Sequence, residues 1–422
     1  MGKLIMMKLI RESTVLLLLA VLSFAALGYS AENVPVPTAY RGLYNKLDRI
    51  LDEQLRIEAG TRTKPAQRGP MLCTDLLVAN SNRGEALLLP QTMQGVIACL
   101  DSFRELGVEC VKFAVQYPLL TSDFPRNEGY VAFYRQVVAE AHKRGLKVMP
   151  HVSVIFADTP FSPMKGIYRG LTLAKFKSEY RLMVTRVANE LKPDYLDLLT
   201  EPDTHAKLTG LRELNQPAVI ADVVQNALRG WDHKGILCGA GSGSWSSTDF
   251  ARAFVAIPKL DYLAIHVYPV NARFLDNARQ MARIAHGAGK QCCIDESWLY
   301  KTERPGGGEN VAASADVFRR DAFSFWQPLD AKFMTLMYEL ACHERIGLLS
   351  FYWSSFLYGN LDYTPELDKI PYRDLMRRLN SVAFAAIRAR APNGLGEHLR
   401  KLAKHDQEAR GLTALPAEAQ DH

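Results

Sequence analysis

Short apolar segments alternate with longer amphipathic segments along most of the chain. From Met71 onward, runs of apolar and β-branched residues predict strands, and the segments with a period of three to four residues predict helices. Gly, Pro or Asn marks most of the switches. The predicted strands are 71–80, 108–117, 146–156, 194–201, 235–241, 260–268, 290–297 and 346–353. The predicted helices are 91–106, 127–144, 171–191, 215–230, 247–256, 271–288, 312–343 and 372–390.

This strict alternation predicts an α/β fold with a parallel sheet and right-handed crossovers. Eight repeats favour a single closed (β/α)8 TIM barrel over an open doubly wound sheet. The segment 40–60 predicts a further helix outside the barrel. We therefore expect a linker and N-terminal helix over 32–70, the barrel over 71–391, and a charged C-terminal tail over 392–422 that forms a surface helix and frays.

The first 31 residues have the three-part layout of a secretory signal peptide. Lys3, Lys8 and Arg11 precede an apolar run over 15–28, and small residues follow it before Glu32. The apolar run is shorter than the ~20 residues needed to span a bilayer, which favours cleavage over a retained anchor. We expect a secreted or periplasmic protein with no stable membrane insertion after cleavage.

Composition narrows the classes of partner. The chain of 422 residues is 48% hydrophobic and 23% charged, as in ordinary globular proteins, and its formal charge of +6 is spread without a basic block after the N-terminus. This argues against nucleic-acid binding. The seven cysteines sit mostly in apolar runs and form no C-x-x-C pair, and there is no H-x-H pair, so we expect buried thiols, no metal and no cofactor. We expect a monomer.

Two glutamates close predicted strands. The active site of a (β/α)8 barrel lies at the C-terminal ends of its strands. Glu201 ends the fourth strand in LLTEPDTH, and Glu296 ends the seventh in CCIDESWLY. A strand-end glutamate alone is more often a loop ion pair or a helix cap, but a pair after such apolar runs is costly unless it is used. The pair is therefore a candidate for acid and base chemistry.

At these residues the sequence resembles the large clan of retaining (β/α)8 glycoside hydrolases that includes cellulases, β-mannanases and endo-β-1,4-galactanases. The resemblance covers about residues 71–365 and does not select a family. It implies that Glu201, in Thr200-Glu201-Pro202, is the acid/base and that Glu296 is the nucleophile. The clan usually has Asn before the acid/base, so the shorter hydroxyl of Thr200 would replace an amide contact to the sugar 2-hydroxyl.

The sixth and eighth strands extend the resemblance. His266-Val267-Tyr268 matches the aromatic or His-x-Tyr signature of strand six, and Trp353 matches the tryptophan that stacks under the sugar. Cleavage with retention needs one carboxyl to protonate the leaving oxygen and a second, ~5–5.5 Å away, to attack the sugar. Tyr268 can donate to Glu296 and hold it ionised. His266 can do the same or bind a sugar hydroxyl.

Other candidates are less specific. His151, on the third strand, either binds substrate or is a satisfied core histidine. Trp245 and Trp298 lie in loops above the barrel and, with Trp353, suit stacking on a sugar face. By the period-two alternation, Asp295 points away from the barrel axis and has a structural role. Weaker polar candidates in apolar runs are Asp75, Lys112 and Gln116, and the Gly-rich loop 301–310 suits a mobile lid or plain disorder.

These patterns predict an exported retaining glycoside hydrolase that cleaves a β-linked oligo- or polysaccharide by double displacement, without a cofactor. The alternative is a non-catalytic carbohydrate-binding barrel derived from such an enzyme, with Thr200 as its first sign of drift. A metal-dependent barrel hydrolase is a weaker third interpretation, because His151 and His266 are the only strand-borne histidines and no H-x-H pair is present.

Overall fold

The computed structural model describes residues 34–61, 69–229, 231–232, 235–268, 271–302 and 314–409. The predicted signal peptide over 1–31, nearly all of the predicted lid and the last residues of the tail lie outside these ranges.

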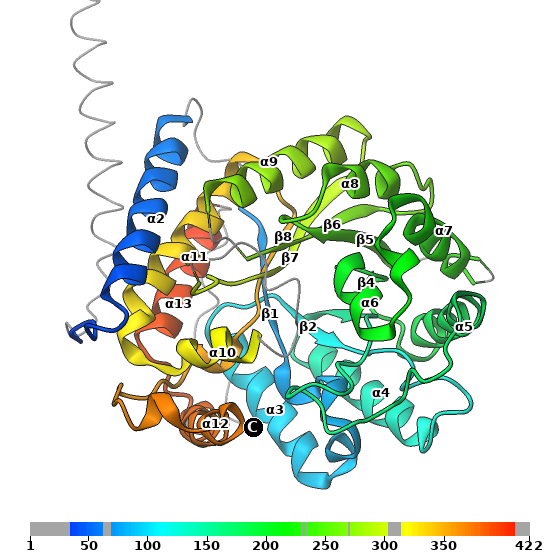
Figure 1. Cartoon of the computed structure of the whole chain (residues 1–422), viewed down its shortest axis with the longest axis horizontal. Helices are drawn as coiled ribbons and strands as arrows, with labels where there is room; N and C mark the ends of the chain where they lie inside the picture. Colours follow the sequence, from blue (N-terminus) through cyan, green and yellow to red (C-terminus); the bar gives the residue numbers. More distant parts are fainter. Residues whose placement is uncertain are drawn as a thin grey trace, which may run out of the picture.

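Eight parallel strands form one closed barrel in the order β1 to β8 (Figure 1), which confirms the predicted (β/α)8 fold. Seven strands fall inside their predicted segments, and β5 runs two residues past its predicted end. The strands are β1 Met71–Asp75, β2 Cys110–Ala114, β3 Lys147–His151, β4 Tyr195–Asp197, β5 Leu237–Gly243, β6 Tyr262–Val267, β7 Gln291–Ser297 and β8 Leu348–Phe351.

Helices surround the barrel (Figure 1). They are α2 Arg41–Thr61, α3 Pro90–Glu105, α4 Asn127–Lys143, α5 Leu173–Leu191, α6 Pro202–Thr209, α7 Pro217–Ala227, α8 Thr248–Val255, α9 Ala272–Gly287, α10 Ser314–Phe318, α11 Gln327–His343, α12 Tyr372–Arg388 and α13 Gly394–Ala409. The pattern did not predict α6. The predicted helix 312–343 is interrupted by two short 3-10 turns, and α11 begins anew with a proline in its first turn.

The first and last helices of the described chain, α2 and α13, both pack against α11 (Figure 1). The predicted N-terminal helix is α2, which buries Leu43, Leu47 and Leu51 along one face. The helix predicted in the charged tail is α13, and the residues after 409, where fraying was predicted, lie outside the described ranges. Leu395 and Leu399 of α13 are fully buried, because the leucine stripe, and not the charged face, decides where the helix packs.

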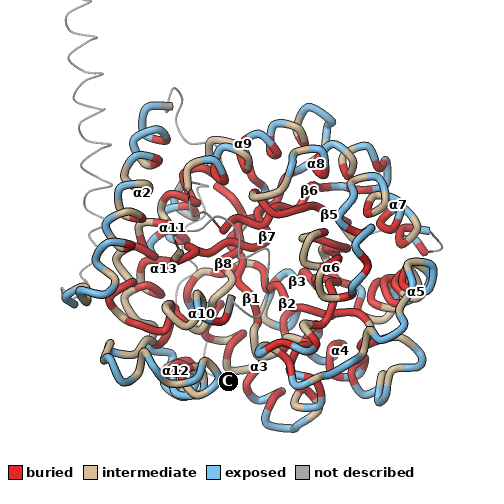
Figure 2. The backbone as a smooth tube through the Cα atoms, in the orientation of Figure 1, coloured by how far each residue is buried: buried red, intermediate tan, exposed pale blue. Residues whose placement is uncertain are grey.

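The barrel interior has two layers. Figure 2 shows that the strands are buried along almost their whole length. One layer is apolar and consists of Cys73, Cys110, Met149, Tyr262, Ala264, Cys293 and Leu348. The other layer, toward the C-terminal ends of the strands, contains buried charged and polar side chains. The seven cysteines form no disulfide within the described ranges, and six of them are buried, as predicted.

No helix within the described ranges is both long enough and apolar enough to span a membrane.

Candidate active site

A cavity of about 1050 Å³ opens at the C-terminal ends of the strands. The structure brings eight of the nine predicted site residues to its wall. These are His151, Thr200, Glu201, Trp245, His266, Tyr268, Glu296 and Trp353. The barrel therefore gathers side chains from β3 to β8 around one space, as the topology requires.

Glu201 is held by an unusual backbone conformation after β4. It adopts φ 56° and ψ 66°, in the left-handed region, immediately before Pro202 begins α6. Such a conformation costs a non-glycine residue about 1–3 kcal/mol and persists where the surroundings enforce it, often at functional sites. The turn lets the Glu201 carboxylate reach His266, whose Nδ1 lies 2.7 Å from Oε1.

Glu296 is held from two sides at the end of β7. Tyr268 donates its hydroxyl to Oε1 at 2.6 Å, as predicted, and the Lys112 ammonium donates to Oε2 at 3.1 Å. Lys112 is fully buried on β2 and also donates to Asp295 at 3.0 Å. The sequence pattern ranked Lys112 only as a weak candidate, although it supplies the cation beside the proposed nucleophile.

His266 lies between the two glutamates. Its Nδ1 contacts Glu201, and its Nε2 lies 3.8 Å from Glu296 Oε2 and 3.3 Å from Asp295 Oδ2. Burial alone would lower the pKa of His266, but the carboxylates of Glu296 and Asp295 outweigh it and raise that pKa well above its usual value. The imidazole therefore carries a proton in the free protein.

The charge of His266 also affects Glu201 and favours its ionised form. Burial would raise the pKa of Glu201, but the hydrogen bond and charge of His266 more than compensate and lower it. The mechanism expected from the sequence requires a protonated acid at this position. The neighbouring imidazole of His266, 2.7 Å away, is the group whose pKa is raised, because Glu296 and Asp295 favour its charged form.

Asp295 faces into the barrel, and the prediction that it points outward is wrong. Between the pairs Ala264–Cys293 and His266–Glu296, β7 has one residue more than β6. This bulge interrupts the alternation of side chains, so that consecutive residues reach the same interior. Asp295 accepts hydrogen bonds from Lys112, and its pKa lies well below the usual range because Lys112 and His266 outweigh the effect of burial.

Two further buried carboxyls complete this layer. Burial raises the pKa of Asp197 on β4 well above its ordinary value, and the neighbouring charge of Asp295 adds to the effect. Burial likewise raises the pKa of Asp75 on β1. Both shifts favour the neutral acid form of these carboxyls. Asp197 was not a sequence candidate, although an aspartate inside the apolar run YLDLL was a visible sign.

Thr200 connects two histidines. Its hydroxyl lies 3.0 Å from Nε2 of His151 and 3.0 Å from Nε2 of His266, and the residue is fully buried. Burial and the nearby Lys112 charge lower the pKa of His151 well below its usual value, so this ring is neutral. The hydroxyl at this position therefore orients the ring of His266 as well as lining the cavity.

The tryptophans divide into two groups. Trp245 and Trp353 line the cavity, and the indole N–H of Trp353 has no hydrogen-bond partner among the described residues. Trp298 is only 1% exposed, and its indole N–H donates to Asp321 at 2.9 Å. The prediction that Trp298 stacks on substrate is wrong, because its ring is buried beside Phe356 and Lys301 and does not line the cavity.

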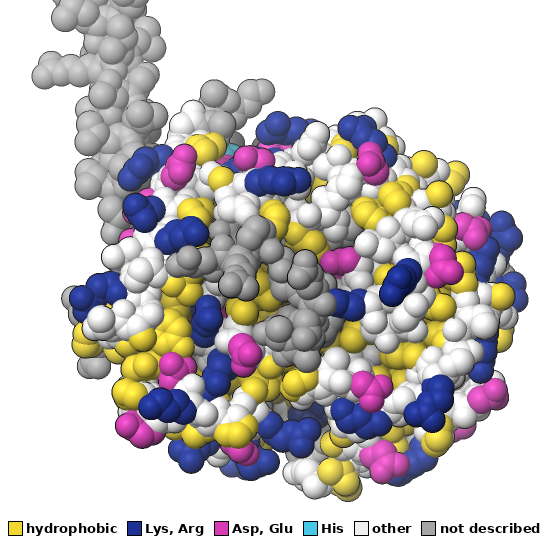
Figure 3. Space-filling model, in the orientation of Figure 1, with side chains coloured by type: hydrophobic (Ala, Val, Ile, Leu, Met, Phe, Trp, Pro, Cys, Tyr) yellow, Lys and Arg dark blue, Asp and Glu magenta, His cyan; other side chains and the backbone are white. Residues whose placement is uncertain are grey.

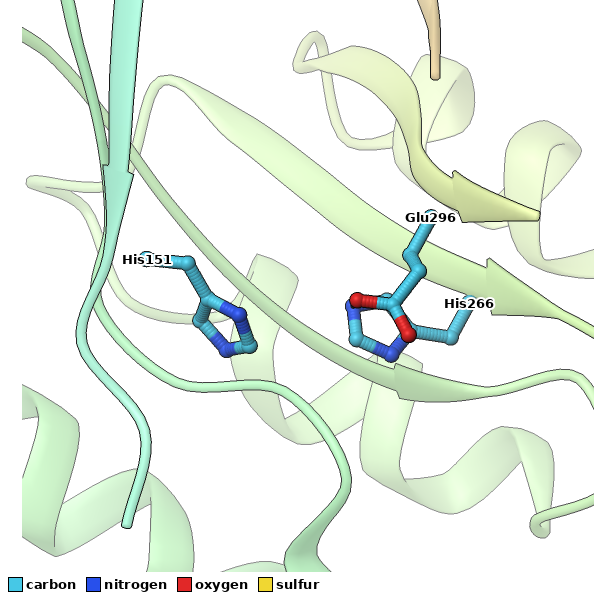
Figure 4. A group of neighbouring side chains, drawn as sticks. All are labelled: His151, His266 and Glu296. Carbon is cyan, nitrogen blue, oxygen red and sulfur yellow. The ribbon is translucent and has the colours of Figure 1, made fainter. Parts of the chain in front are cut away.

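Figure 4 shows His151 opposite the carboxyl of Glu296 and the ring of His266. Ligand atoms of these three residues lie close enough together to hold a metal ion, as do those of Asp197, His266 and Asp295. The Lys112 ammonium, however, lies 3.3 Å from His266 Nε2 and 3.1 Å from Glu296 Oε2. Its positive charge lies beside two of these ligand atoms and would repel a divalent cation bound to them, so the donor set fits a proton network better than a metal site.

No family model matches the chain, and no curated protein matches it either. Solved structures do match. The exo-beta-1,4-mannosidase Op5Man5 from Opitutaceae bacterium strain TAV5 superposes with a TM-score of 0.53 at 12% identity. The match covers 83% of this chain and 61% of that protein, so the chain spans less than two thirds of its length.

Two bifidobacterial structures match along more of their own length. GH5_18 from Bifidobacterium longum subsp. infantis has a TM-score of 0.52 at 13% identity, over 80% of this chain and 79% of that one. A GH5_18 variant from Bifidobacterium longum subsp. longum, in complex with Manβ1-4GlcNAc, has a TM-score of 0.50 at 15% identity, over 82% and 80%. These matches confirm the fold as the barrel seen in GH5-type glycoside hydrolases.

Proposed function

We propose that the chain is a retaining β-glycoside hydrolase with Glu296 as nucleophile and Glu201 as acid/base. The observation that carries the proposal is the arrangement of the two glutamates. They come from the fourth and seventh strands, line one cavity, and are joined through His266. Tyr268 and Lys112 hold Glu296 as the carboxylate that a nucleophile requires.

In the first step a Glu296 oxygen forms a bond to the anomeric carbon as the bond to the leaving oxygen breaks. The leaving oxygen takes a proton from Glu201. Glu201 in turn receives this proton from Nδ1 of His266, across the hydrogen bond of 2.7 Å. His266 becomes neutral, which also removes a positive charge from beside Glu296 as its negative charge is consumed.

In the second step Glu201 acts as the general base. It accepts a proton from a water molecule, whose oxygen attacks the anomeric carbon and releases the Glu296 carboxylate. The proton then returns to His266, and the site regains its starting charges. The lowered pKa of Glu201 suits this second role directly, because the carboxylate is the form that removes a proton from water.

The substrate we propose is a β-linked glycan. Trp353 and Trp245 offer aromatic faces beside the glutamates for the C–H face of a sugar ring. The first sugars to test are β-mannosides, since one similar structure is described as an exo-β-1,4-mannosidase and another holds Manβ1-4GlcNAc. The sequence of residues 1–31 leads us to propose that the protein works after export.

The test is a hydrolysis panel of β-linked manno-, gluco- and galacto-oligosaccharides and their aryl glycosides. We expect Glu201→Gln to lower turnover of oligosaccharides by roughly 10²–10⁴, since these need protonation of the leaving oxygen. Formation of the intermediate from dinitrophenyl glycosides should stay near the wild-type rate, because that leaving group needs no proton. Equal losses on both substrates would contradict the acid role.

The competing function is a non-catalytic carbohydrate-binding barrel. The panel separates the two, because a binding barrel would bind an oligosaccharide in calorimetry and release no product from any member of the panel. The Glu296→Gln variant serves as the control for contaminating hydrolase activity. Turnover that persists in this variant would contradict the assignment of the nucleophile.

A further inference from the structure

The cavity continues well beyond the two glutamates. Its second part runs between α3 and α12 and is lined on the α3 side by Gln91, Thr92, Gly95 and Cys99. Four arginines line this second part, which we call the arginine arm. They are Arg83, Arg373, Arg377 and Arg388. Figure 3 shows Lys and Arg side chains gathered over the boundary between α3 and α12.

Three of the four arginines form a row on α12. At 100° per residue, positions 373, 377 and 388 fall within an arc of roughly 60° on the helix surface. This row faces the cavity, whereas Arg378, the next residue after Arg377, does not line it. The row is therefore a property of one face of α12, and the helix presents it to the cavity.

The arm holds positive charge that the protein itself neutralises only in part. Among the described residues, neither Arg83 nor Arg373 has an ion-pair partner, and Arg388 lies over the ring of Phe384 at 5.5 Å. Only Arg377 pairs with a carboxylate, Asp374, at 3.1 Å. The three arginines of α12 are exposed to solvent, and Arg373 and Arg377, four residues apart, repel each other weakly.

The acidic side chains of the cavity are all at the other end. They are Asp75, Glu201, Asp203 and Glu296, at the ends of the strands or just beyond them. At the site the carboxylates of Glu201 and Glu296 already lie beside cationic partners, His266 and Lys112, whereas the arm has arginines with no such neutralisation apart from Arg377. A neutral glycan would leave the guanidinium groups of the arm without a counter-charge, whereas an anionic glycan would supply one.

We propose that the substrate is an anionic β-linked glycan, whose acidic groups bind the arginine arm while the scissile bond lies between Glu201 and Glu296. This inference rests on the proposed glycosidase function for the position of the bond. The guanidinium group binds carboxylate and sulfate through two parallel hydrogen bonds, so several arginines in a row fit a chain with a repeated acidic group. Uronic acid residues and sulfated sugars share this chemistry.

The test is the affinity of the Glu296→Gln protein for matched oligosaccharides, measured by titration calorimetry at low salt. Hexamers of β-1,4-mannuronate and β-1,4-mannose differ only in the C6 carboxylate, and β-1,4-glucuronate and β-1,4-glucose form a second pair. A sulfated mannohexaose and a single-stranded hexanucleotide complete the set. We expect the acidic member of at least one pair to bind about tenfold tighter than the neutral member, with a Kd that rises with salt.

The variants are Arg373→Gln alone and with Arg377→Gln and Arg388→Gln, and the matched control is Arg378→Gln on the same helix. We expect the triple variant to weaken binding of the acidic hexamer by about tenfold or more, and the single variant by a smaller factor. Arg378→Gln should leave the Kd within about twofold. The melting temperature shows whether the triple variant is folded, and the single variant carries the test if it is not.

Each result decides the proposal. Arginine-dependent binding of a uronate or of the sulfated hexamer supports it and identifies the acidic group. Equal or tighter binding of the neutral hexamers, no binding of any glycan, or tightest binding of the hexanucleotide overturns it. Hydrolysis of neutral glycans without arginine-dependent binding would remove this inference and leave the glycosidase function. Arginine-dependent binding of an anionic glycan that the wild-type protein never cleaves would support the role of the arginine arm and contradict the glycosidase function.

Discussion

Two buried lysines, each between two carboxylates, lie in different parts of this molecule. Lys112 donates to Asp295 at 3.0 Å and to Glu296 at 3.1 Å. Lys301 donates to Asp330 at 2.6 Å and also contacts Asp321. Both ammonium groups are fully buried. The composition of the two clusters is nearly the same, so composition cannot explain why only one of them is a candidate active site.

The surroundings explain the difference. The Lys112 cluster contacts His266 and opens into the cavity through Glu296, whose side chain is 11% exposed. The Lys301 cluster is closed, with the ammonium 5.6 Å from the ring centre of Trp298 and 5.8 Å from that of Trp326. A buried charge therefore marks a site for chemistry only where a reactant can reach it, and otherwise holds chain segments together.

The largest effect should come from removing each lysine in turn. Lys301→Met leaves two buried carboxylates without a cation and should destabilise the fold by about 3–5 kcal/mol. Turnover per folded molecule should stay near the wild-type value. Lys112→Met should lower kcat/KM by roughly a hundredfold or more, because it removes the cation beside the nucleophile. Urea unfolding and kinetics on the same preparations measure both quantities.

The comparison breaks if the two variants behave alike. A fully active Lys112→Met protein would mean that the open cluster is only structural. A folded, stable Lys301→Met protein with lost activity would mean that the closed cluster takes part in the chemistry.

The two clusters should also respond to pH in different ways. Burial raises the pKa of Asp330 from 3.8 to about 7, against the opposing charge of Lys301. The folded state then binds a proton that the unfolded state has released, so stability falls as pH rises from about 4 to about 7. Asp330→Asn should flatten this part of the stability curve, as measured by urea unfolding at a series of pH values.

In the open cluster we expect the proton on His266 to decide activity. Since the pKa of His266 is raised well above 6.5, kcat/KM should hold through neutral pH and fall only as the pH rises through that higher value. His266→Gln should remove this basic limb and lower activity. If wild-type kcat/KM falls with a midpoint near pH 6.5, or if the basic limb of the pH profile is unchanged in His266→Gln, His266 does not supply the catalytic proton.

A smaller effect should separate two tryptophans. Trp353→Ala should raise KM by roughly tenfold with little change in stability, because it removes an aromatic face from the cavity. Trp298→Ala should instead cost about 3–5 kcal/mol of stability, as expected for a buried tryptophan. Kinetics and thermal unfolding of the two variants provide the measurement, and the reverse pattern would restore a binding role for Trp298.

Most of the fold could be read from hydrophobic periodicity, because every barrel strand is a short apolar run between turn residues. The packing of the tail helix was not predicted, for a related reason. Its composition is charged, yet Leu395, Leu399 and Leu402 recur at helical spacing and are buried. Average composition hides such a stripe, whereas position along the helix reveals it.

The sequence predicted the site residues that follow directly from a position at the end of a strand segment, as for Glu201, Glu296 and Tyr268. The site could not be predicted where backbone irregularity intervenes. Asp295 continues the inward alternation of Cys293, and the bulge in β7 brings Glu296 to the same interior, but no residue type in QCCIDES announces the extra residue. Lys112 and Asp197 depend on pairing between distant strands, which one sequence does not specify.

The central claim, that Glu296 is the nucleophile of a retaining hydrolase, is tested most directly by trapping. A 2-deoxy-2-fluoro-β-glycoside with a dinitrophenyl leaving group, made from the sugar that the hydrolysis panel selects, slows breakdown of the glycosyl-enzyme. Mass spectrometry of the digested protein should show one added fluoroglycosyl group, on the peptide that contains Glu296, and none in the Glu296→Gln variant. A label on another residue, or steady hydrolysis of the natural glycoside with no label at all, would contradict the account.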